Sequence, residues 1–497
     1  MINTFDWFKK WAGYTPDKIA LKDAESGTTL TYRQINNASN SISYYLKDKY
    51  QLKKGDRIAI IAENDLTQVL LFGAAQKMGI ILVPINYRLA HAEVEYLLGD
   101  SECSLVLYSE GSYNIHGLKY EATYEPIAPF IHFIDDESPE YEEQVNEEDP
   151  IFILYTSGTT GFPKGTLYTH KMLFWNSINT ALSLTISSTT KTLNCMPLFH
   201  TGGWNVLLTP VLHHGGTIIM FKKFDAEKIL RSIVSEKLDL FMGVPTMLKM
   251  IAELPEFEST DISFLNYIIV GGESMPTPLI RKYHNKKVPI RQGYGLTEVG
   301  PNLTSLHQRE AERKQGSIGK PNFYVQVRIV DDNENNLPPN EPGELWISGP
   351  MVTPGYWKND KATANSKSEG WFKTGDVALM DQEGFLFIVD RKKHMYISGG
   401  ENVYPVEVER VLLQHEAINE AVVFGIPHEK WGECGAALIV KGKEISSEEI
   451  RDYCMKNLAK FKVPTEIHFI DSIPKGDTGK IDRKTLKSTF MKERDMA

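Results

Sequence analysis

Cysteine is scarce in this 497-residue chain, and long apolar runs are absent. The four cysteines, Cys103, Cys195, Cys434 and Cys454, lack the spacing of a disulfide framework or a zinc site. Runs such as GIILVPI have the length of core strands and fall short of the roughly 18 residues that span a bilayer. The N-terminal MINTFDWFKKWAG lacks the apolar core and cleavage site of a signal peptide. We therefore expect a reduced, cytoplasmic protein without a transmembrane segment, and leave peripheral membrane contact open.

Positive charge is also in short supply. Lys and Arg total 54 against 64 Asp and Glu, which gives a net charge of −10. This balance leaves no broad basic face and argues against a nucleic-acid partner. Acidic residues gather in DDESPEYEEQVNEED (135–149), which we interpret as a solvated loop rather than a recognition tail.

The order of apolar and polar residues predicts an α/β fold. Short β-branched runs alternate with amphipathic stretches, as in RIAIIAEN before TQVLLFGAAQKMG and IFILYTSG before THKMLFWNSINTALSL. Such alternation is typical of layered, mostly parallel sheets. Between residues 325 and 348, two closely spaced strands separated by NENNLPPNEPG predict a hairpin or small β-barrel attached to this body.

The pattern resets near residue 390, where a second domain is expected. A helix-like PVEVERVLLQ and strand-like AVVFGI and ALIVKG follow, and Ser446 with Glu449 has the spacing of a helix capping box. The length of the chain also calls for more than one core. We predict a large N-terminal domain at 1–390 and a smaller, mobile α+β domain at 391–497.

The most specific local pattern is YTSGTTGFPKG (155–165), directly after the strand-like IFIL. Glycines allow tight turns and a close approach to a ligand, while hydroxyls and backbone N–H groups can cradle phosphate oxygens. The expected phosphate-binding residues are Thr156, Ser157, Gly158, Thr159, Thr160, Gly161 and the cationic Lys164. A P-loop is excluded, because its nearest match, PKGDTGK (474–480), has proline for the first glycine and isoleucine after the lysine.

This loop resembles the phosphate-binding signature of the adenylate-forming superfamily, which includes acyl-CoA synthetases and the adenylation domains of peptide synthetases. Further segments that resemble that family follow in its order, so the resemblance covers nearly the whole chain. They are PLFHTGG (197–203), GGESMP (271–276), QGYGLTE (292–298), TGD (374–376), DRKKHMYISGGENVYP (390–405) and IPKGDTGKIDR (473–483). The resemblance implies an AMP-forming acid–thiol ligase that uses ATP, Mg²⁺ and coenzyme A.

The resemblance also implies roles for residues of the large domain. His200 would line the acyl-carboxylate pocket, Thr297 would touch the α-phosphate, and Glu298 would hold Mg²⁺, a cation that prefers oxygen ligands. The nucleotide and acyl pocket would include Gly271, Gly272, Glu273, Tyr294 and Gly295, with the ring of Tyr294 stacked on the base. Glu273 stands where many relatives carry alanine, which leaves its role open.

Near the domain boundary, Asp376 resembles the family's aspartate that hydrogen-bonds both ribose hydroxyls. Arg391 resembles the family's arginine on the ribose and phosphate side of the nucleotide. The resemblance also implies a hinge between the two domains near residues 390–393, with Lys393 as the hinge residue. His394 and Tyr396 depart from the commoner acidic and aliphatic residues there.

Two segments of the small domain are expected to reach the ligands. Gly399 and Gly400 would let the pantetheine arm of coenzyme A pass close to the backbone. Lys480 falls on the family's catalytic lysine, which bridges the carboxylate and the α-phosphate. With His200, Lys164 and Thr297 it would form the catalytic set, because this chemistry needs positioning and neutralised charge rather than a protein nucleophile.

The identity of the acid is less well determined. Trp204, four residues after His200, stands where fatty-acyl members of the family can carry a gate to an apolar tunnel, which favours a medium- or long-chain fatty acid. A tryptophan that packs the pocket wall, and an aromatic acid of the benzoate or cinnamate type, remain alternatives. So do an adenylation enzyme that loads a carrier protein and a non-catalytic nucleotide-binding protein. The neighbouring His213 and His214 match no motif and are expected on a surface loop. Either a monomer or a homodimer is compatible with the sequence.

Overall fold

The first apolar runs form parallel strands joined by a helix, as the sequence predicts. In the computed structural model, β3 (Arg57–Ile61) pairs in parallel with β4 (Ile81–Ile85). Between them, α3 (Leu66–Met78) begins at Asp65, whose side chain accepts a hydrogen bond from the first turn, and ends at Gly79 with a φ of +69°. Local cap and strand signals therefore determine this βαβ unit.

The structure describes residues 5–156, 163–272, 275–391, 394–398, 401–428, 431–458, 460–475 and 481–496, with the backbone alone at 391, 401, 402, 495 and 496. The chain divides into two compact units. Unit 1 comprises Met1–Gln315, Gly319–Gln326 and Ile347–Phe372. Unit 2 comprises Gly316–Ile318, Val327–Trp346 and Lys373–Ala497.

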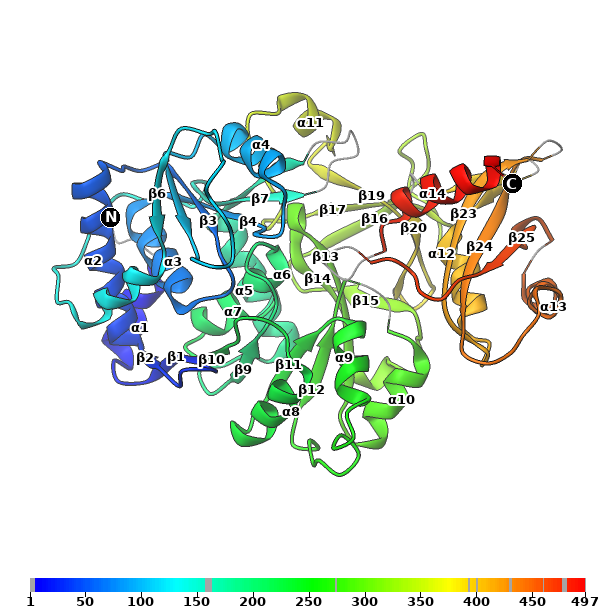
Figure 1. Ribbon diagram of the computed structural model, residues 1–497, viewed down its shortest axis with the longest axis horizontal. Helices are drawn as coiled ribbons and strands as arrows, with labels where there is room; N and C mark the ends of the chain where they lie inside the picture. The colour runs from blue at the N-terminus through cyan, green and yellow to red at the C-terminus, as the bar shows by residue number, and fades with distance from the viewer. Residues whose placement is uncertain are drawn as a thin grey trace. The chain divides into compact units, whose positions relative to one another are not determined.

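One sheet of unit 1 has six strands in the order β6-β5-β3-β4-β7-β8. All neighbours are parallel except β7 and β8. Helices α2 and α3 pack with one face of this sheet and α4 with the other (Figure 1). The remaining elements here are α1 (Trp7–Tyr14), α2 (Tyr32–Tyr50), α4 (His91–Ser101), β5 (Leu105–Tyr108), β6 (Thr123–Pro126), η1 (Ala128–Asp135), β7 (Pro150–Thr156) and β8 (Lys164–Thr169).

Two further groups of strands belong to unit 1. One sheet has the order β2-β1-β10-β9, and in the other group β11, β12 and β13 are parallel while β14 is antiparallel to β13. The strands are β1 (Ile19–Asp23), β2 (Thr29–Thr31), β9 (Lys191–Asn194), β10 (Thr217–Met220), β11 (Leu240–Gly243), β12 (Tyr267–Val270), β13 (Ile290–Leu296), β14 (Gly300–Leu306), β15 (Ser317–Pro321) and β18 (Lys367–Ser368).

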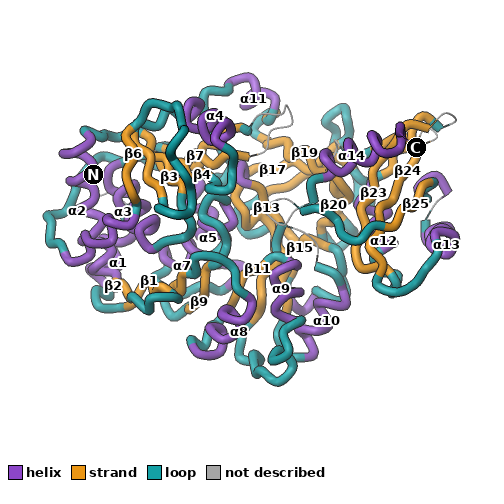
Figure 2. The backbone as a smooth tube through the Cα atoms, in the orientation of Figure 1, coloured by secondary structure: helices purple, strands orange, loops and turns teal. Residues whose placement is uncertain are grey.

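Helices alternate with these strands along the chain, as the purple and orange segments of Figure 2 show. They are α5 (His170–Leu184), α6 (Thr201–Asn205), α7 (Leu208–His213), α8 (Ala226–Ser235), α9 (Pro245–Ala252), α10 (Thr277–Asn285), η2 (Thr297–Val299), η3 (Gln308–Glu310) and α11 (Asp360–Asn365). The predicted strand–helix alternation of the large α/β body is thereby confirmed.

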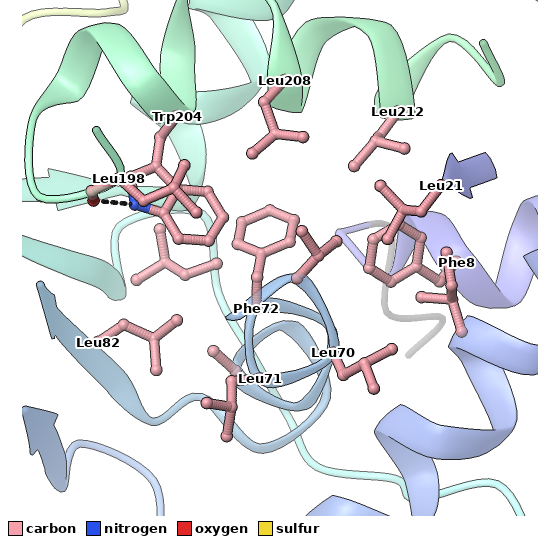
Figure 3. Packing of buried hydrophobic residues seen from close by; sticks show 14 of the residues in the cluster. Phe8, Leu21, Leu70, Leu71, Phe72, Leu82, Leu198, Trp204, Leu208 and Leu212 are labelled. Atoms are coloured by element: carbon pink, nitrogen blue, oxygen red, sulfur yellow. Dashed lines mark hydrogen bonds between the residues drawn. The ribbon is translucent and has the colours of Figure 1, made fainter. Parts of the chain in front are cut away.

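The largest core of unit 1 joins side chains of the six-stranded sheet to those of β11 and β12. Within it, the rings of Phe72 and Trp204 lie 5.7 Å apart between centroids, and those of Phe152 and Trp204 lie 5.0 Å apart. The indole N–H of Trp204 donates to the Leu198 carbonyl at 2.6 Å (Figure 3). A buried tryptophan needs such a partner for its one polar atom.

Two groups of strands contribute to unit 2. One group lies in the order β20-β19-β17-β16, and its neighbours β16 and β17 are the two closely spaced strands that the sequence predicted between residues 325 and 348. The other has the order β22-β21-β24-β23, with β25 beside β24. The strands are β16 (Gln326–Val330), β17 (Gly343–Ser348), β19 (Trp371–Met380), β20 (Leu386–Arg391), β21 (Tyr396–Ser398), β22 (Glu401–Val403), β23 (Ile418–His428), β24 (Gly432–Lys441) and β25 (Glu466–Phe469).

The helices of unit 2 are α12 (Pro405–Leu412), α13 (Ser447–Asn457), η4 (Lys460–Lys462) and α14 (Arg483–Met496). The capping box at Ser446 and Glu449 is present as predicted. A smaller α+β part at the C-terminal end is thus confirmed. Because unit 2 also takes in residues before 390, the exact boundary at 390 stays a prediction.

Two expectations about polar segments are corrected by the structure. The acidic stretch is a loop, but it is not merely solvated, because Glu140 accepts hydrogen bonds from Asn36 at 2.7 Å and from the fully buried Lys77 at 3.3 Å. His213 and His214 do not lie on a surface loop. His213 ends α7 and stacks on the ring of Trp7 with centroids 4.0 Å apart.

Candidate functional site

The predicted phosphate loop joins two strands that hold its ends together. β7 and β8 are antiparallel, and Thr156 stands opposite Lys164 in their register. Both ends of the loop are therefore fixed by the hairpin ladder of the six-stranded sheet. The predicted residues Ser157, Gly158, Thr159, Thr160 and Gly161 lie outside the described residues.

The carboxylate of Glu298 lies directly beside this hairpin. Glu298 belongs to η2, the short helix that follows β13. Its Oε1 atom accepts a hydrogen bond from Thr156 Oγ1 at 3.2 Å and another from the Tyr356 hydroxyl at 3.1 Å. The fold thus brings together two predicted residues, the first of the loop and the proposed metal ligand, that are 142 positions apart.

Tyr356 was missed by the sequence analysis. The chain on either side of it runs along β8, where Leu167 N donates to the Gly355 carbonyl at 3.1 Å and Trp357 N donates to the Gly165 carbonyl at 2.7 Å. The same segment reaches η2 through Thr353 N, which donates to the Glu298 carbonyl at 2.8 Å. No local pattern in TPGYW signals this placement, because every partner is remote in sequence.

Tyr356 also contacts Lys164, the predicted cation of the loop. The Lys164 Nζ atom lies 5.3 Å from the centroid of the Tyr356 ring, within the range of a cation–π contact. Burial raises the pKa of the Tyr356 phenol, and the charge of Glu298 beside it raises this pKa further. The hydroxyl therefore remains a donor to Glu298 throughout the neutral pH range.

The predicted glycine segments meet at the carboxyl ends of neighbouring parallel strands. Gly271 and Gly272 directly follow β12, while Tyr294 and Gly295 lie in the adjoining strand β13. Ligands of open α/β sheets bind at this edge. A Cβ atom on Gly295 would lie 2.3 Å from the carbonyl carbon of Pro301, so only glycine fits there. Glu273 lies outside the described residues.

Thr297, the first residue of η2, comes directly after β13 and next to Glu298. The structure thereby places this predicted α-phosphate contact in the same turn as the predicted metal ligand.

His200 occupies the turn that precedes α6. Its backbone N–H donates to the Pro197 carbonyl at 3.2 Å, and its partly exposed ring makes an edge contact with Phe199, with centroids 4.5 Å apart. Trp204 lies one turn further on, in the core, with 1% of its surface exposed. Those contacts are typical of a core residue, and a gating role for Trp204 stays a prediction.

The predicted ribose-binding pair belongs to unit 2. Asp376 of β19 and Arg391 of β20 are partners in antiparallel register. Asp376 is buried, and its backbone N–H donates to Thr374 Oγ1 at 3.1 Å. The side chain of Arg391 and all of Lys393, Gly399, Gly400 and Lys480 lie outside the described residues, so their predicted roles stay predictions.

The described residues offer a suitable partial site for a hard cation. They contain no group of three or more His, Cys, Asp and Glu side chains that could hold a metal ion by themselves. Mg²⁺ commonly takes one or two carboxylates together with substrate phosphates, and Glu298 beside the hydroxyl of Thr156 fits that use. Among the helices of the described part of the chain, none is long and apolar enough to cross a membrane.

Comparisons with known proteins identify the family of this chain. A feruloyl-CoA synthase from Amycolatopsis sp is 34% identical over 487 residues, which cover 97% of this chain and 98% of the relative. The long-chain-fatty-acid–CoA ligase FadD13 from Mycobacterium tuberculosis is 34% identical over 491 residues, which cover 96% of this chain and 97% of the relative.

Solved structures show the same similarity. The o-succinylbenzoate CoA synthetase MenE from Bacillus subtilis, in complex with its acyl-adenylate intermediate OSB-AMP, matches with a TM-score of 0.88 and 32% identity over 97% of this chain and 98% of that one. The same synthetase in complex with ATP and a magnesium ion matches with a TM-score of 0.87 and 31% identity, covering 97% of this chain and 99% of that one. Residues 8–357 match the family model described as AMP-binding enzyme, and residues 407–480 match the AMP-binding enzyme C-terminal domain. The chain therefore belongs to the AMP-binding enzyme family.

Proposed function

We propose that this chain joins a carboxylic acid to coenzyme A in two steps. The acid's carboxylate oxygen first attacks the α-phosphate of ATP, which gives acyl-AMP and releases pyrophosphate. The thiol of coenzyme A then attacks the acyl carbon, which gives the thioester and releases AMP and a proton. The chain is thus an acid–thiol ligase of the AMP-forming type. The observation that carries this proposal is the cluster of Thr156, Lys164 and Glu298 beside the glycine-bearing ends of β12 and β13.

The first step brings two anions together, so the protein must position them and offset their charge. Lys164 supplies a cation at the mouth of the phosphate loop, and the hydroxyl of Thr297 supplies a neutral donor. Bound Mg²⁺ would neutralise phosphate charge, and Glu298 with Thr156 would hold it. The glycines after β12 leave room for the nucleotide to lie against the backbone.

The substrate class is a finer proposal, and it rests on a polar wall formed by side chains between α5, α6 and β14. α6 begins right after His200 and β14 right after η2, and both pack against α5. Amide side chains meet there. Asn302 Nδ2 donates to Thr180 Oγ1 at 2.6 Å, and Asn176 Nδ2 donates to the Asn205 carbonyl at 2.7 Å. A hydrocarbon tunnel would not need this polar wall.

One acceptor in this wall has no partner among the described residues. Asn176 is 1% exposed, and its Oδ1 atom accepts no hydrogen bond there. This oxygen lies 3.0 Å from the point where a Cβ atom on Gly300 would stand, two residues after Glu298. A buried acceptor without a donor costs about 1–3 kcal/mol, which a ligand hydroxyl would recover. We therefore propose an acid that carries a polar group, such as a hydroxylated aromatic acid, ahead of an unsubstituted fatty acid.

Paired acids test the substrate class. The purified chain with ATP, Mg²⁺ and coenzyme A is assayed on cinnamate, 4-hydroxycinnamate and a graded series of fatty acids. The proposal expects kcat/KM for the hydroxylated acid to exceed that for its parent by about tenfold or more, since a site built around a substrate hydroxyl rejects the analogue without it. A maximum on a medium- or long-chain fatty acid would overturn the polar-acid proposal and restore the interpretation based on Trp204.

The two half-reactions test the role that we propose for the C-terminal domain, which would rotate about Lys393 between the steps. Lys480→Ala should abolish acyl-AMP formation and leave thioester formation from supplied acyl-AMP intact. The matched control is Lys475→Ala, because Lys475 forms an ion pair with Glu420 at 2.8 Å and has no proposed role in catalysis. Equal losses in both half-reactions of Lys480→Ala would refute the role of Lys480. Pyrophosphate release that coenzyme A does not stimulate would favour a carrier-loading adenylation enzyme instead.

A further inference from the structure

We propose that Tyr356 is a positioning residue that fixes the carboxylate of Glu298 in one orientation and keeps it apart from Lys164. This inference rests on the proposed function, in which Glu298 faces a metal ion and Lys164 faces phosphate. Neither the motifs of the sequence nor any predicted role includes Tyr356. The argument uses three contacts, all within unit 1.

Both hydroxyls that reach Glu298 donate to the same oxygen. Tyr356 OH lies 3.1 Å from Oε1, and Thr156 Oγ1 lies 3.2 Å from it. Two donors occupy the lone pairs of that atom and fix the rotation of the carboxylate plane. In the part of the chain that the structure describes, Oε2 forms no hydrogen bond or ion pair with protein. The two hydroxyls thus leave one oxygen, at a set angle, for a ligand.

The ring of Tyr356 performs a second task. Lys164 Nζ lies over it, 5.3 Å from the centroid, while the hydroxyl of the same side chain holds Glu298. Within the described residues, Lys164 and Glu298 form no ion pair. A direct pair would neutralise the two charges that the ligands require. Tyr356 contacts both charged groups, so that Lys164 lies against its ring and Glu298 against its hydroxyl instead of pairing with each other.

The backbone around Tyr356 is fixed firmly enough for this role. Its N–H donates to Thr363 Oγ1 at 2.9 Å, and Trp357 N donates to the Gly165 carbonyl at 2.7 Å. The segment is therefore attached to β8, the strand that Lys164 begins. A residue whose segment is attached to the strand that follows the loop can hold both charges without depending on the loop itself.

Equilibrium binding of ATP provides the test. The dissociation constant of ATP is measured with EDTA and again with saturating Mg²⁺, and the ratio of the two reports the contribution of the metal ion without any turnover. Tyr356→Phe removes the hydroxyl and keeps the ring. We expect it to lower this ratio about tenfold, because loss of a group that orients a metal ligand costs about 10–100-fold in metal affinity. Binding of ATP in EDTA should stay nearly unchanged, because Tyr356→Phe keeps the ring that contacts Lys164. Tyr356→Leu, which also removes the ring, should change ATP binding in EDTA as well.

Tyr155→Phe is the matched control. It also removes a hydroxyl that bonds a carboxylate, since Tyr155 OH donates to Asp100 Oδ2 at 2.6 Å. Tyr155 precedes Thr156 in β7, so its side chain points to the opposite face of the sheet. Its substitution should leave the ratio unchanged. An equal ratio in Tyr356→Phe and in the unsubstituted chain, with both folded by melting temperature, would overturn the proposal. A failure of the proposed function is distinguishable, because it would appear as absent acid-dependent AMP formation while the ATP ratios could still be compared.

Discussion

His170 should make the stability of unit 1 depend on pH between about 6.5 and 4. It is the first residue of α5 and 1% exposed, and neither ring nitrogen has a hydrogen-bond partner within the described residues. Burial is the main cause that lowers its pKa from 6.5 to about 4, with the charge of Asp149 raising it and that of Lys54 lowering it. The positive end of the helix dipole also disfavours a charged ring at this position.

The sign and size of the effect follow from these values. A folded pKa below the unfolded one means that the unfolded chain binds the proton more tightly, so stability is complete above pH 6.5 and falls as pH decreases towards 4. The gap between 6.5 and about 4, at roughly 1.36 kcal/mol per pH unit, limits the total loss to about 3 kcal/mol. Between pH 7.5 and pH 5 the expected loss is about 2 kcal/mol.

Hydrogen exchange of peptides from α5, corrected for intrinsic rates at each pH, measures this loss in unit 1 directly. Two variants separate the causes. His170→Gln and His170→Phe both lack the titrating ring, so each should lose about 2 kcal/mol less than the unsubstituted chain on going from pH 7.5 to pH 5. His170→Phe should in addition be the more stable of the two at pH 7.5, since it leaves no buried polar atom unpaired. An identical pH dependence in all three proteins would refute the reasoning.

Three further substitutions test packing and geometry. Lys77→Met should lower the free energy of unfolding by about 3–5 kcal/mol in urea, because it leaves the buried Asp6, now 2.7 Å from Lys77 Nζ, without a counter-charge. Adding Asp6→Leu should recover part of the loss, and a fully stable single variant would contradict this. Trp204→Phe should cost about 1–3 kcal/mol through the lost bond to Leu198 and leave the preference for acid chain length as it was, so a changed preference would revive the gating role. Gly295→Ala should abolish acid-dependent AMP formation because its Cβ would lie 2.3 Å from the Pro301 carbonyl carbon, whereas Gly99→Ala, with open space around it, should retain activity.

Local sequence signals predicted much of the fold, and the reason is visible in α3. Asp65 before the helix and Gly79 after it are cap residues whose chemistry works within a few positions of the chain. The strand that precedes the phosphate loop was predicted in the same way, whereas β8, which pairs with it after the loop, was not. Where the residues that determine a helix or strand lie within that element or next to it, as in α3, the structure has the element that the sequence predicted.

Contacts between remote segments were not predictable in this way. Tyr356 reaches Glu298 across 58 positions of the sequence. His213 stacks on Trp7, which lies near the start of the chain. The partners of Lys77 lie 41, 63 and 71 positions away. Such pairings depend on how sheets and helices pack, which periodicity does not encode. The family resemblance supplied Glu298 and Asp376, but it did not supply the residues that orient them.

The central claim is that acid activation and thioester formation occur on this one chain. The most direct measurement is the nucleotide product that the purified protein makes from ATP with Mg²⁺, coenzyme A and the best acid of the panel. The account predicts AMP and pyrophosphate, formed only when acid is present, with one thioester made per AMP. ATP binding without acid-dependent AMP, or release of ADP and phosphate, would contradict it.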